Sequence, residues 1–130
     1  MKFFIYLSLT GEKQAKKWFF QLTSAFEYLQ SHGVAHRDIK LENILIDKQR
    51  HVKICDFGFS KLVAPPRKQQ ATEASIEHSR TFCGSIAYCA PEILQKTPYD
   101  PHKSDVWSLG VVLYKMVTRV SFFLYTLFLF

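Results

Sequence analysis

Four polar side chains lie in one short region of the sequence. Their chemical types and their spacing could support a reaction at a phosphate group. Asp38 can accept a proton, and Lys40 supplies a cation two residues later. Asn43 can ligate a hard metal ion through its amide oxygen, and the carboxylate of Asp56, followed by Phe and Gly, could hold such a cation against phosphate oxygens. An isolated Asp-Phe-Gly is common by chance, and a lone Asp in a polar loop is usually only solvated. The separation of 13 positions between Asn43 and Asp56 makes the combination specific.

Regular hydrophobic patterns on both sides indicate how these residues would be positioned. Residues 12–32 carry a helical repeat, with Thr10 as a candidate N-cap and Gly33 as the C-terminal stop. The apolar face of this helix consists of Ala15, Trp18, Phe19, Leu22, Phe26 and Leu29. Residues 43–47 and 51–55 are short β-like runs around a polar turn, which predicts a hairpin. Asp38 and Lys40 therefore fall in a loop between a helix end and a hairpin, where a rigid scaffold can hold them.

The second half of the chain predicts a long loop followed by another helix. Residues 62–80 are rich in Pro and polar side chains and have few large apolar groups. A helix is expected to start at Ser104, which would cap it, with Asp105 in its first turn. Its expected apolar stripe is Val106, Leu109, Val112, Leu113, Met116 and Val117. The fold class expected from these elements is mainly α: helix, small hairpin, long loop, helix.

Composition narrows the functional classes. The 130 residues are 48% hydrophobic and 22% charged, which is ordinary globular usage and argues against wholesale disorder. The net charge of +6 is scattered along the chain, so we expect no nucleic-acid partner. Cys55, Cys83 and Cys89 are odd in number and lack CxxC spacing, which favours a reducing compartment, with the cytoplasm as the expected location.

The two ends of the chain are apolar. Residues 1–9 hold one lysine in an apolar run, but no small-residue cleavage site follows, so we expect buried structure there and not a signal peptide. Residues 120–130 contain no charge and are too few to cross a bilayer as a helix, so no membrane span is expected.

Four motifs, taken in order, resemble the C-terminal lobe of a eukaryotic protein kinase. They are His36-Arg37-Asp38, which resembles the catalytic loop; Asp56-Phe57-Gly58, the metal-binding motif; Ala90-Pro91-Glu92, the end of the activation segment; and Asp105-Val106-Trp107-Ser108-Leu109-Gly110, the central helix. Lys40 is the form found in serine/threonine kinases. The runs 56–61, 81–85 and 92–101 are more narrowly similar to the testis-specific serine/threonine kinases. The resemblance covers residues 12–118 as a partial kinase domain, leaving an N-terminal stub, 1–11, and a hydrophobic tail, 119–130, outside it.

The resemblance implies roles for the polar residues. The reaction would move the γ-phosphoryl group of ATP to a Ser or Thr hydroxyl of a protein substrate. Asp38 would orient that hydroxyl and accept its proton, and Lys40 would offset charge on the phosphoryl group. Asn43 and Asp56 would hold Mg²⁺ against the phosphates, and Leu45 would pack beneath the adenine ring.

The resemblance also implies a switch. Thr81 matches the position that an activating kinase commonly phosphorylates, and Arg37 would pair with the phosphate. Ser79 is the competing acceptor. Ser85 matches a hydroxyl that contacts Asp38 and Lys40, so it is less suited to be a switch.

Other positions are implied to be structural. His36 and Phe57 resemble members of an apolar spine, and Gly58 completes the metal-binding motif. Asp105 resembles the helix carboxylate that holds the backbone of the catalytic loop. Glu92 matches a residue that pairs with an Arg of a later helix.

Nothing in the 130 residues matches the glycine-rich loop or the strand lysine that grip ATP in this family. We therefore expect the isolated polypeptide to be a truncated, inactive piece of a serine/threonine kinase. The alternative is a non-catalytic module that docks kinase substrates or partners.

Overall fold

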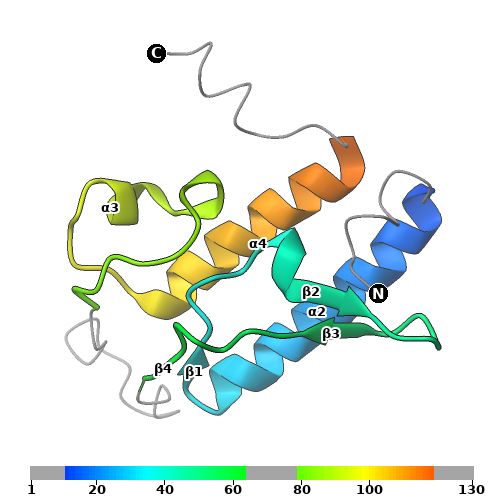
Figure 1. The fold of residues 1–130 in the computed structure, drawn as a ribbon, viewed down its shortest axis with the longest axis horizontal. Helices are drawn as coiled ribbons and strands as arrows, with labels where there is room; N and C mark the ends of the chain where they lie inside the picture. Colours follow the sequence, from blue (N-terminus) through cyan, green and yellow to red (C-terminus); the bar gives the residue numbers. More distant parts are fainter. Residues whose placement is uncertain (1–10, 64–78, 119–130) are drawn as a thin grey trace.

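The computed structural model describes residues 11–63 and 79–118 (Figure 1). The expectations for the Thr10 cap, the apolar run at 1–9, most of the loop at 62–80 and the tail at 119–130 concern residues outside this part of the chain. No helix within residues 11–63 and 79–118 combines the length and the apolar character needed to cross a membrane.

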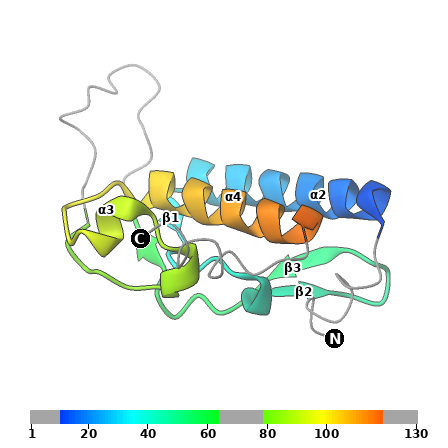
Figure 2. The same cartoon turned by 90° about the horizontal axis from the view of Figure 1, so that it is seen from above.

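Two long helices lie side by side and form the frame of the fold (Figures 1 and 2). They are α2 (Glu12–Ser31) and α4 (Pro101–Thr118). The hairpin of β2 (Ile44–Ile46) and β3 (Val52–Ile54) covers one side of the pair. The short helix α3 (Pro91–Leu94) lies near the N-terminal end of α4, away from the hairpin (Figure 2). Helices hold more of the described residues than strands do, and the order of helix, hairpin and helix agrees with the sequence.

Helix α2 forms where the hydrophobic repeat predicts it. Trp18 and Leu22 are fully buried, and the indole N–H of Trp18 donates to the backbone carbonyl of Arg50, 3.0 Å away. The helix ends before Gly33, whose φ of 69° is readily adopted only by glycine. At the other end the N-cap is Gly11, which offers no side-chain cap. This helix and its C-terminal stop are therefore confirmed.

The predicted hairpin is also present. Strand β2 (Ile44–Ile46) pairs antiparallel with β3 (Val52–Ile54), and Leu45 lies opposite Lys53 at the centre. A second two-stranded sheet was not predicted: β1 (Val34–Ala35) pairs antiparallel with β4 (Lys61–Leu62). The assignment of Leu62 to the long loop was therefore wrong, because strands of two residues are too short to show an alternating pattern.

Helix α4 begins three residues earlier than expected. Asp100, and not Ser104, fixes its start: the Asp100 carboxylate accepts the N–H of His102 at 2.9 Å, and its carbonyl accepts the N–H of Ser104 at 3.1 Å. The predicted apolar stripe was also partly wrong, since Val106 and Val117 are about 60% exposed. The buried face of α4 is instead Pro101, Ser104, Asp105, Ser108, Leu109, Val111, Val112 and Met116. This face carries polar residues because it supports a polar loop as well as the core.

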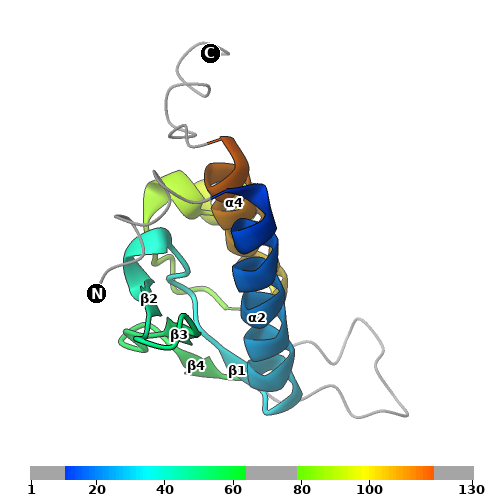
Figure 3. The same cartoon turned by 90° about the vertical axis from the view of Figure 1, so that its right-hand side faces the viewer.

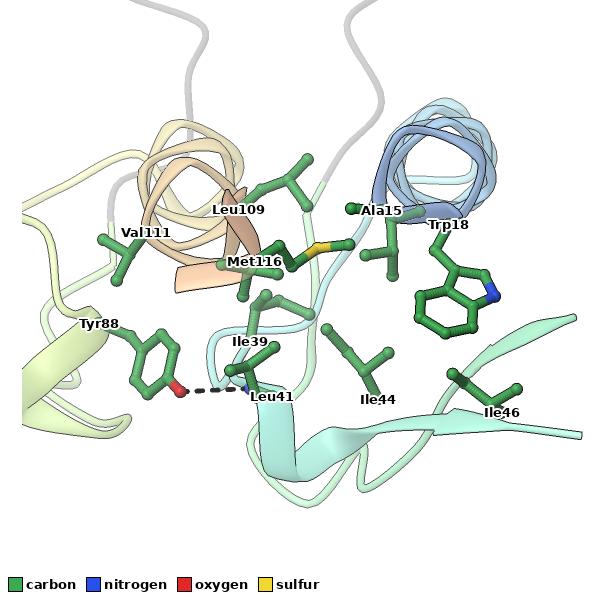
Figure 4. Close-up of a cluster of buried hydrophobic side chains, with 12 residues drawn as sticks. Ala15, Trp18, Ile39, Leu41, Ile44, Ile46, Tyr88, Leu109, Val111 and Met116 are labelled. Carbon is green, nitrogen blue, oxygen red and sulfur yellow. Dashed lines mark hydrogen bonds between the residues drawn. The ribbon is translucent and has the colours of Figure 1, made fainter. Parts of the chain in front are cut away.

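The hydrophobic core lies between the two helices, the hairpin and two 3₁₀ turns, Leu41–Asn43 and Ile86–Tyr88 (Figures 3 and 4). Its buried members are Ala15, Trp18, Leu22, Ile39, Leu41, Ile44, Ile46, Tyr88, Leu109, Val111, Val112 and Met116. Ile39 and Leu41 alternate with Asp38 and Lys40 in the sequence, so the core anchors the loop that carries the polar pair.

Candidate active site

Asp38 lies at the centre of a dense group of hydrogen bonds. Its side chain is 4% exposed, and both carboxylate oxygens accept hydrogen bonds. Lys40 Nζ donates to Oδ2 at 2.7 Å, and Asn43 Nδ2 donates to the same oxygen at 3.2 Å. The Ser85 hydroxyl and backbone N–H donate to Oδ1 at 3.0 and 3.1 Å. The structure thus brings together four residues that are up to 47 positions apart in the sequence.

These donors keep the Asp38 carboxyl ionised. Burial acts to raise its pKa, but the hydrogen bonds from Lys40, Ser85 and Asn43 outweigh that effect, and the net pKa is lowered. A buried, ionised carboxylate can accept a hydrogen bond from a substrate hydroxyl and fix its direction. A lowered pKa also makes Asp38 a weak base.

Lys40 links Asp38 and Ser85 within this group of hydrogen bonds. Its ammonium donates to the Asp38 carboxylate and to the Ser85 hydroxyl, 3.0 Å away, while its side chain remains 22% exposed. The cation is therefore fixed in direction and still open to solvent on one side. It can meet a negatively charged group that approaches the Asp38 carboxylate from outside.

The backbone around Asp38 is held from beneath by α4. The Asp105 carboxylate accepts the N–H of His36 at 2.6 Å and the N–H of Arg37 at 2.8 Å. Burial raises the pKa of Asp105 to about 6, although the two backbone hydrogen bonds oppose the shift. Arg37 has a φ of 65°, a left-handed conformation that is uncommon for residues other than glycine, and the two bonds to Asp105 hold the backbone there.

His36 connects this loop to the segment around Asp56. Its buried ring packs against the ring of Phe57 with centroids 4.7 Å apart, and its Nε2 lies 3.1 Å from the carbonyl of Cys55. Because a carbonyl only accepts, Nε2 carries the proton and Nδ1 accepts the N–H of Asp38 at 3.3 Å. Burial lowers the pKa of His36, which agrees with this neutral form.

Asp56 lies directly beyond the hairpin, next to Asn43. The N–H of Cys55 donates to the Asn43 carbonyl at 2.9 Å, so the following residue leaves the sheet beside the Asn43 backbone. Asp56 has a φ of 64°, is exposed, and accepts the N–H of Gly58 at 3.3 Å. Within the described part of the chain, no bond joins the side chains of Asp56 and Asn43.

The donor set suits a hard cation such as Mg²⁺. Asn43 uses its amide nitrogen for Asp38, and its amide oxygen accepts no hydrogen bond from residues 11–63 or 79–118. The exposed Asp56 carboxylate supplies further oxygen ligands. No group of three or more His, Cys, Asp or Glu side chains that could bind a metal occurs among the described residues.

The remaining predicted residues lie around this centre. Thr81 is exposed; Arg37, its expected partner, donates instead to the Phe59 carbonyl at 2.7 Å and to the Ser79 hydroxyl at 3.2 Å. The Glu92 carboxylate makes no ion pair with any described residue. Leu45 is half-buried in β2.

One residue of the site was missed from the sequence. The Tyr88 hydroxyl accepts the N–H of Leu41 at 3.3 Å (Figure 4). It also donates to Glu42 at 3.2 Å, and the ammonium of Lys115 lies 3.9 Å from the Tyr88 ring centroid. Burial raises the pKa of the Tyr88 hydroxyl well above its ordinary value, so it stays protonated. The available signal was the one aromatic side chain in the run between Ser85 and Pro91.

The sequence matches the protein kinase domain over residues 3–126. The chain belongs to the protein kinase family.

Its relatives include serine/threonine kinases. It is 49% identical over 114 residues to human testis-specific serine/threonine-protein kinase 4 and 51% identical over 106 residues to mouse testis-specific serine/threonine-protein kinase 2. It is 44% identical over 107 residues to CBL-interacting protein kinase 25 of Oryza sativa subsp. japonica. Each alignment covers 82% of this chain, but only 34%, 28% and 20% of these relatives. The chain therefore spans about a third or less of their length.

Proposed function

We propose that this chain is part of an ATP-dependent protein serine/threonine kinase, in which residues 12–118 supply the half of the catalytic domain called the C-terminal lobe. The resemblance left 1–11 and 119–130 outside the domain, whereas the family match extends over residues 3–126. The observation that carries the proposal is the Asp38 carboxylate, held by Lys40, Asn43 and Ser85 in one group of hydrogen bonds.

The proposed reaction follows from this geometry. Asp38 orients the hydroxyl of a Ser or Thr in a protein substrate, and that oxygen bonds to the γ-phosphorus of ATP while the bond to ADP breaks. The hydroxyl proton passes to Asp38. Lys40, held at 2.7 Å from Asp38, offsets negative charge on the transferring group. Most of the rate enhancement then comes from positioning and electrostatics, which the hydrogen bonds around Asp38 supply.

The nucleotide and its metal have proposed contacts in this half of the domain. Asn43 and Asp56 would hold Mg²⁺, whose charge offsets that of the phosphate oxygens. Leu45 would lie beneath the adenine ring. His36, Phe57 and Gly58 would set the direction of the Asp56 segment, which the packing of the His36 and Phe57 rings supports.

Regulation is proposed to act through Thr81. An activating kinase would transfer a phosphoryl group from ATP to the exposed Thr81 hydroxyl, releasing ADP and the hydroxyl proton. The product would pair with the Arg37 guanidinium. Arg37 precedes Asp38 in the sequence, so this pairing would tie the activation segment to the catalytic loop.

The proposed location of the protein is the cytoplasm, because the number and spacing of its cysteines favour a reducing compartment.

Phosphoryl transfer by a longer protein that contains this chain tests the proposal. With γ-labelled ATP, Mg²⁺ and a basic protein substrate, label should appear on Ser and Thr but not on Tyr. Asp38→Asn should abolish the transfer, whereas Asp47→Asn, at a carboxylate in the hairpin turn, should leave it intact. The 130-residue polypeptide alone should transfer nothing.

Two outcomes contradict the proposal. Transfer that persists in the Asp38→Asn protein would show that another group is essential. A longer protein that binds the substrate saturably, transfers no phosphate, and binds equally well with Asp38→Asn would favour the docking module instead.

A further inference from the structure

The start of the segment that carries Thr81 is joined to the segment before α4. Ser79 and Tyr99 form an antiparallel bridge, with backbone N–H to carbonyl distances of 2.7 Å from Ser79 and 3.1 Å from Tyr99. Both residues are 2% exposed. Backbone pairing and burial therefore fix the main chain of Ser79, from which its hydroxyl projects.

The Arg37 guanidinium reaches this bridge and finds only neutral partners there. It donates to the Ser79 hydroxyl at 3.2 Å and to the Phe59 carbonyl at 2.7 Å. No carboxylate of residues 11–63 or 79–118 makes an ion pair with it. Because an arginine side chain stays charged at all physiological pH values, this half-buried cation has room for a stronger, anionic partner.

Thr81 is placed to supply that anion. Its backbone N–H lies 3.4 Å from the Ser79 hydroxyl, and its carbonyl accepts the Tyr99 hydroxyl at 2.9 Å. Two residues span at most about 7 Å, so a phosphate on Thr81 lies within reach of the Arg37 nitrogen that Ser79 now occupies. The Thr81 side chain is exposed and open to a modifying enzyme.

We propose that Ser79 is a positioning residue that competes with phosphorylated Thr81 for Arg37; this inference rests on the proposed function of Thr81. While Thr81 is unmodified, the Ser79 hydroxyl holds the guanidinium beside the catalytic loop. A phosphate on Thr81 displaces Ser79, because a guanidinium–phosphate pair joins two charged groups and can be bidentate, whereas the Ser79 hydroxyl is a neutral acceptor. The competition weakens the pairing of the phosphate by about tenfold or more, the effect of one hydrogen bond to a charged group.

The rate at which a broad-specificity phosphatase removes the phosphate from residue 81 tests this competition. The full chain is made with phosphothreonine at position 81, unmutated or with Ser79→Ala, and circular dichroism confirms that both are folded. Ser79→Ala should slow dephosphorylation by about tenfold or more, because the phosphate then pairs with Arg37 unopposed. Ser24→Ala is the control: its hydroxyl donates only within α2, to Phe20, and the rate should not change.

Arg37→Ala separates this inference from the proposed switch. It should speed dephosphorylation and abolish the effect of Ser79→Ala. If Arg37→Ala leaves the rate unchanged, the pairing proposed for phosphorylated Thr81 is wrong. If it speeds the reaction but Ser79→Ala in the unmutated background does not slow it, only the competition is wrong. Neither result depends on whether the chain transfers phosphate itself.

A second measurement needs no variant at Ser79. The NMR signals of the Ser79 amide and Cβ should shift when Thr81 carries a phosphate, while those of Ser24 stay in place. Unchanged Ser79 signals would overturn the competition.

Discussion

Gly84 is the position at which one methyl group should be most costly to the site. Its φ is +105°, a region that side chains rarely adopt. A Cβ there would lie 2.8 Å from the carbonyl oxygen of Arg37 and 3.7 Å from Cys89 Sγ. The Arg37 backbone cannot easily yield, because its N–H is bound to Asp105 at 2.8 Å. Gly84→Ala therefore forces Ser85 and the Asp38 loop apart.

Two contributions determine how much Gly84→Ala lowers the free energy of unfolding. Holding alanine in an unfavourable region of φ costs about 1–3 kcal/mol, and forcing an extra methyl into a packed site costs about 1–3 kcal/mol more. We expect Gly84→Ala to lower the free energy of unfolding by about 2–6 kcal/mol. A small domain typically has about 5–15 kcal/mol in total, so the variant loses a large share of its stability.

Urea unfolding of the chain, followed by circular dichroism and by the fluorescence of the buried Trp18, measures this loss. Gly110→Ala is the matched control. Gly110 lies in α4 with nothing within 4 Å of an added Cβ, and the same methyl group there should stabilise the chain by about 0.5–1 kcal/mol. The reasoning fails if Gly84→Ala is as stable as the unmutated chain, or if both variants change stability in the same direction.

Three further predictions concern single side chains. Ser85→Ala should slow phosphoryl transfer by the longer protein about tenfold, because Asp38 loses a hydrogen bond from a hydroxyl; unchanged initial rates would contradict this. Lowering the pH should change the contributions of His36 and Asp105 to the free energy of unfolding in opposite directions. Because the pKa of His36 is lowered, its contribution to stability is lost as the pH falls below 6.5. The pKa of Asp105 is raised from 3.8 to about 6, so its contribution to stability is complete below pH 3.8 and is lost as the pH rises through 6. Asp105→Asn should therefore lose more unfolding free energy between pH 7 and pH 5 than the unmutated chain, and an equal or smaller loss would refute the assignment. Trp18→Phe should cost about 1–3 kcal/mol, since it removes the hydrogen bond from the indole N–H to the Arg50 carbonyl; urea unfolding would show it.

Local sequence patterns predicted the parts of the fold that depend on neighbours in the sequence. Helix α2 and the hairpin were predictable because a hydrophobic period and a turn lie within each segment. The pairing of β1 with β4 was not, because two-residue strands form only when the surrounding structure brings them together. The start of α4 was misplaced because Asp100 and Ser104 are both good N-caps, and tertiary packing buries Ser104 inside the helix.

The residues of the site also divide into those that the sequence predicts and those that it does not. The residue types at Asp38, Lys40, Asn43 and Asp56 were visible in the sequence because chemistry restricts them. Their partners were less visible when they came from distant segments: the hydroxyl of Tyr88 reaches Leu41 across 47 positions. Such contacts depend on the packing of the activation segment against the catalytic loop, which no local pattern encodes.

The partner of Arg37 shows the same limit. Its expected partner was a modified Thr81, but in the structure the guanidinium binds Ser79, 42 positions away. The bridge between Ser79 and Tyr99, which no local pattern predicts, brings Ser79 to that position.

The central claim is that Asp38 is an ionised hydrogen-bond acceptor held by Lys40, Asn43 and Ser85. Titration of the Asp38 carboxyl carbon by NMR in the 130-residue chain tests it most directly. We predict a pKa below the ordinary value of 3.8, which rises when Lys40→Met removes the strongest donor. A pKa at or above 3.8 that does not respond to Lys40→Met would contradict the account.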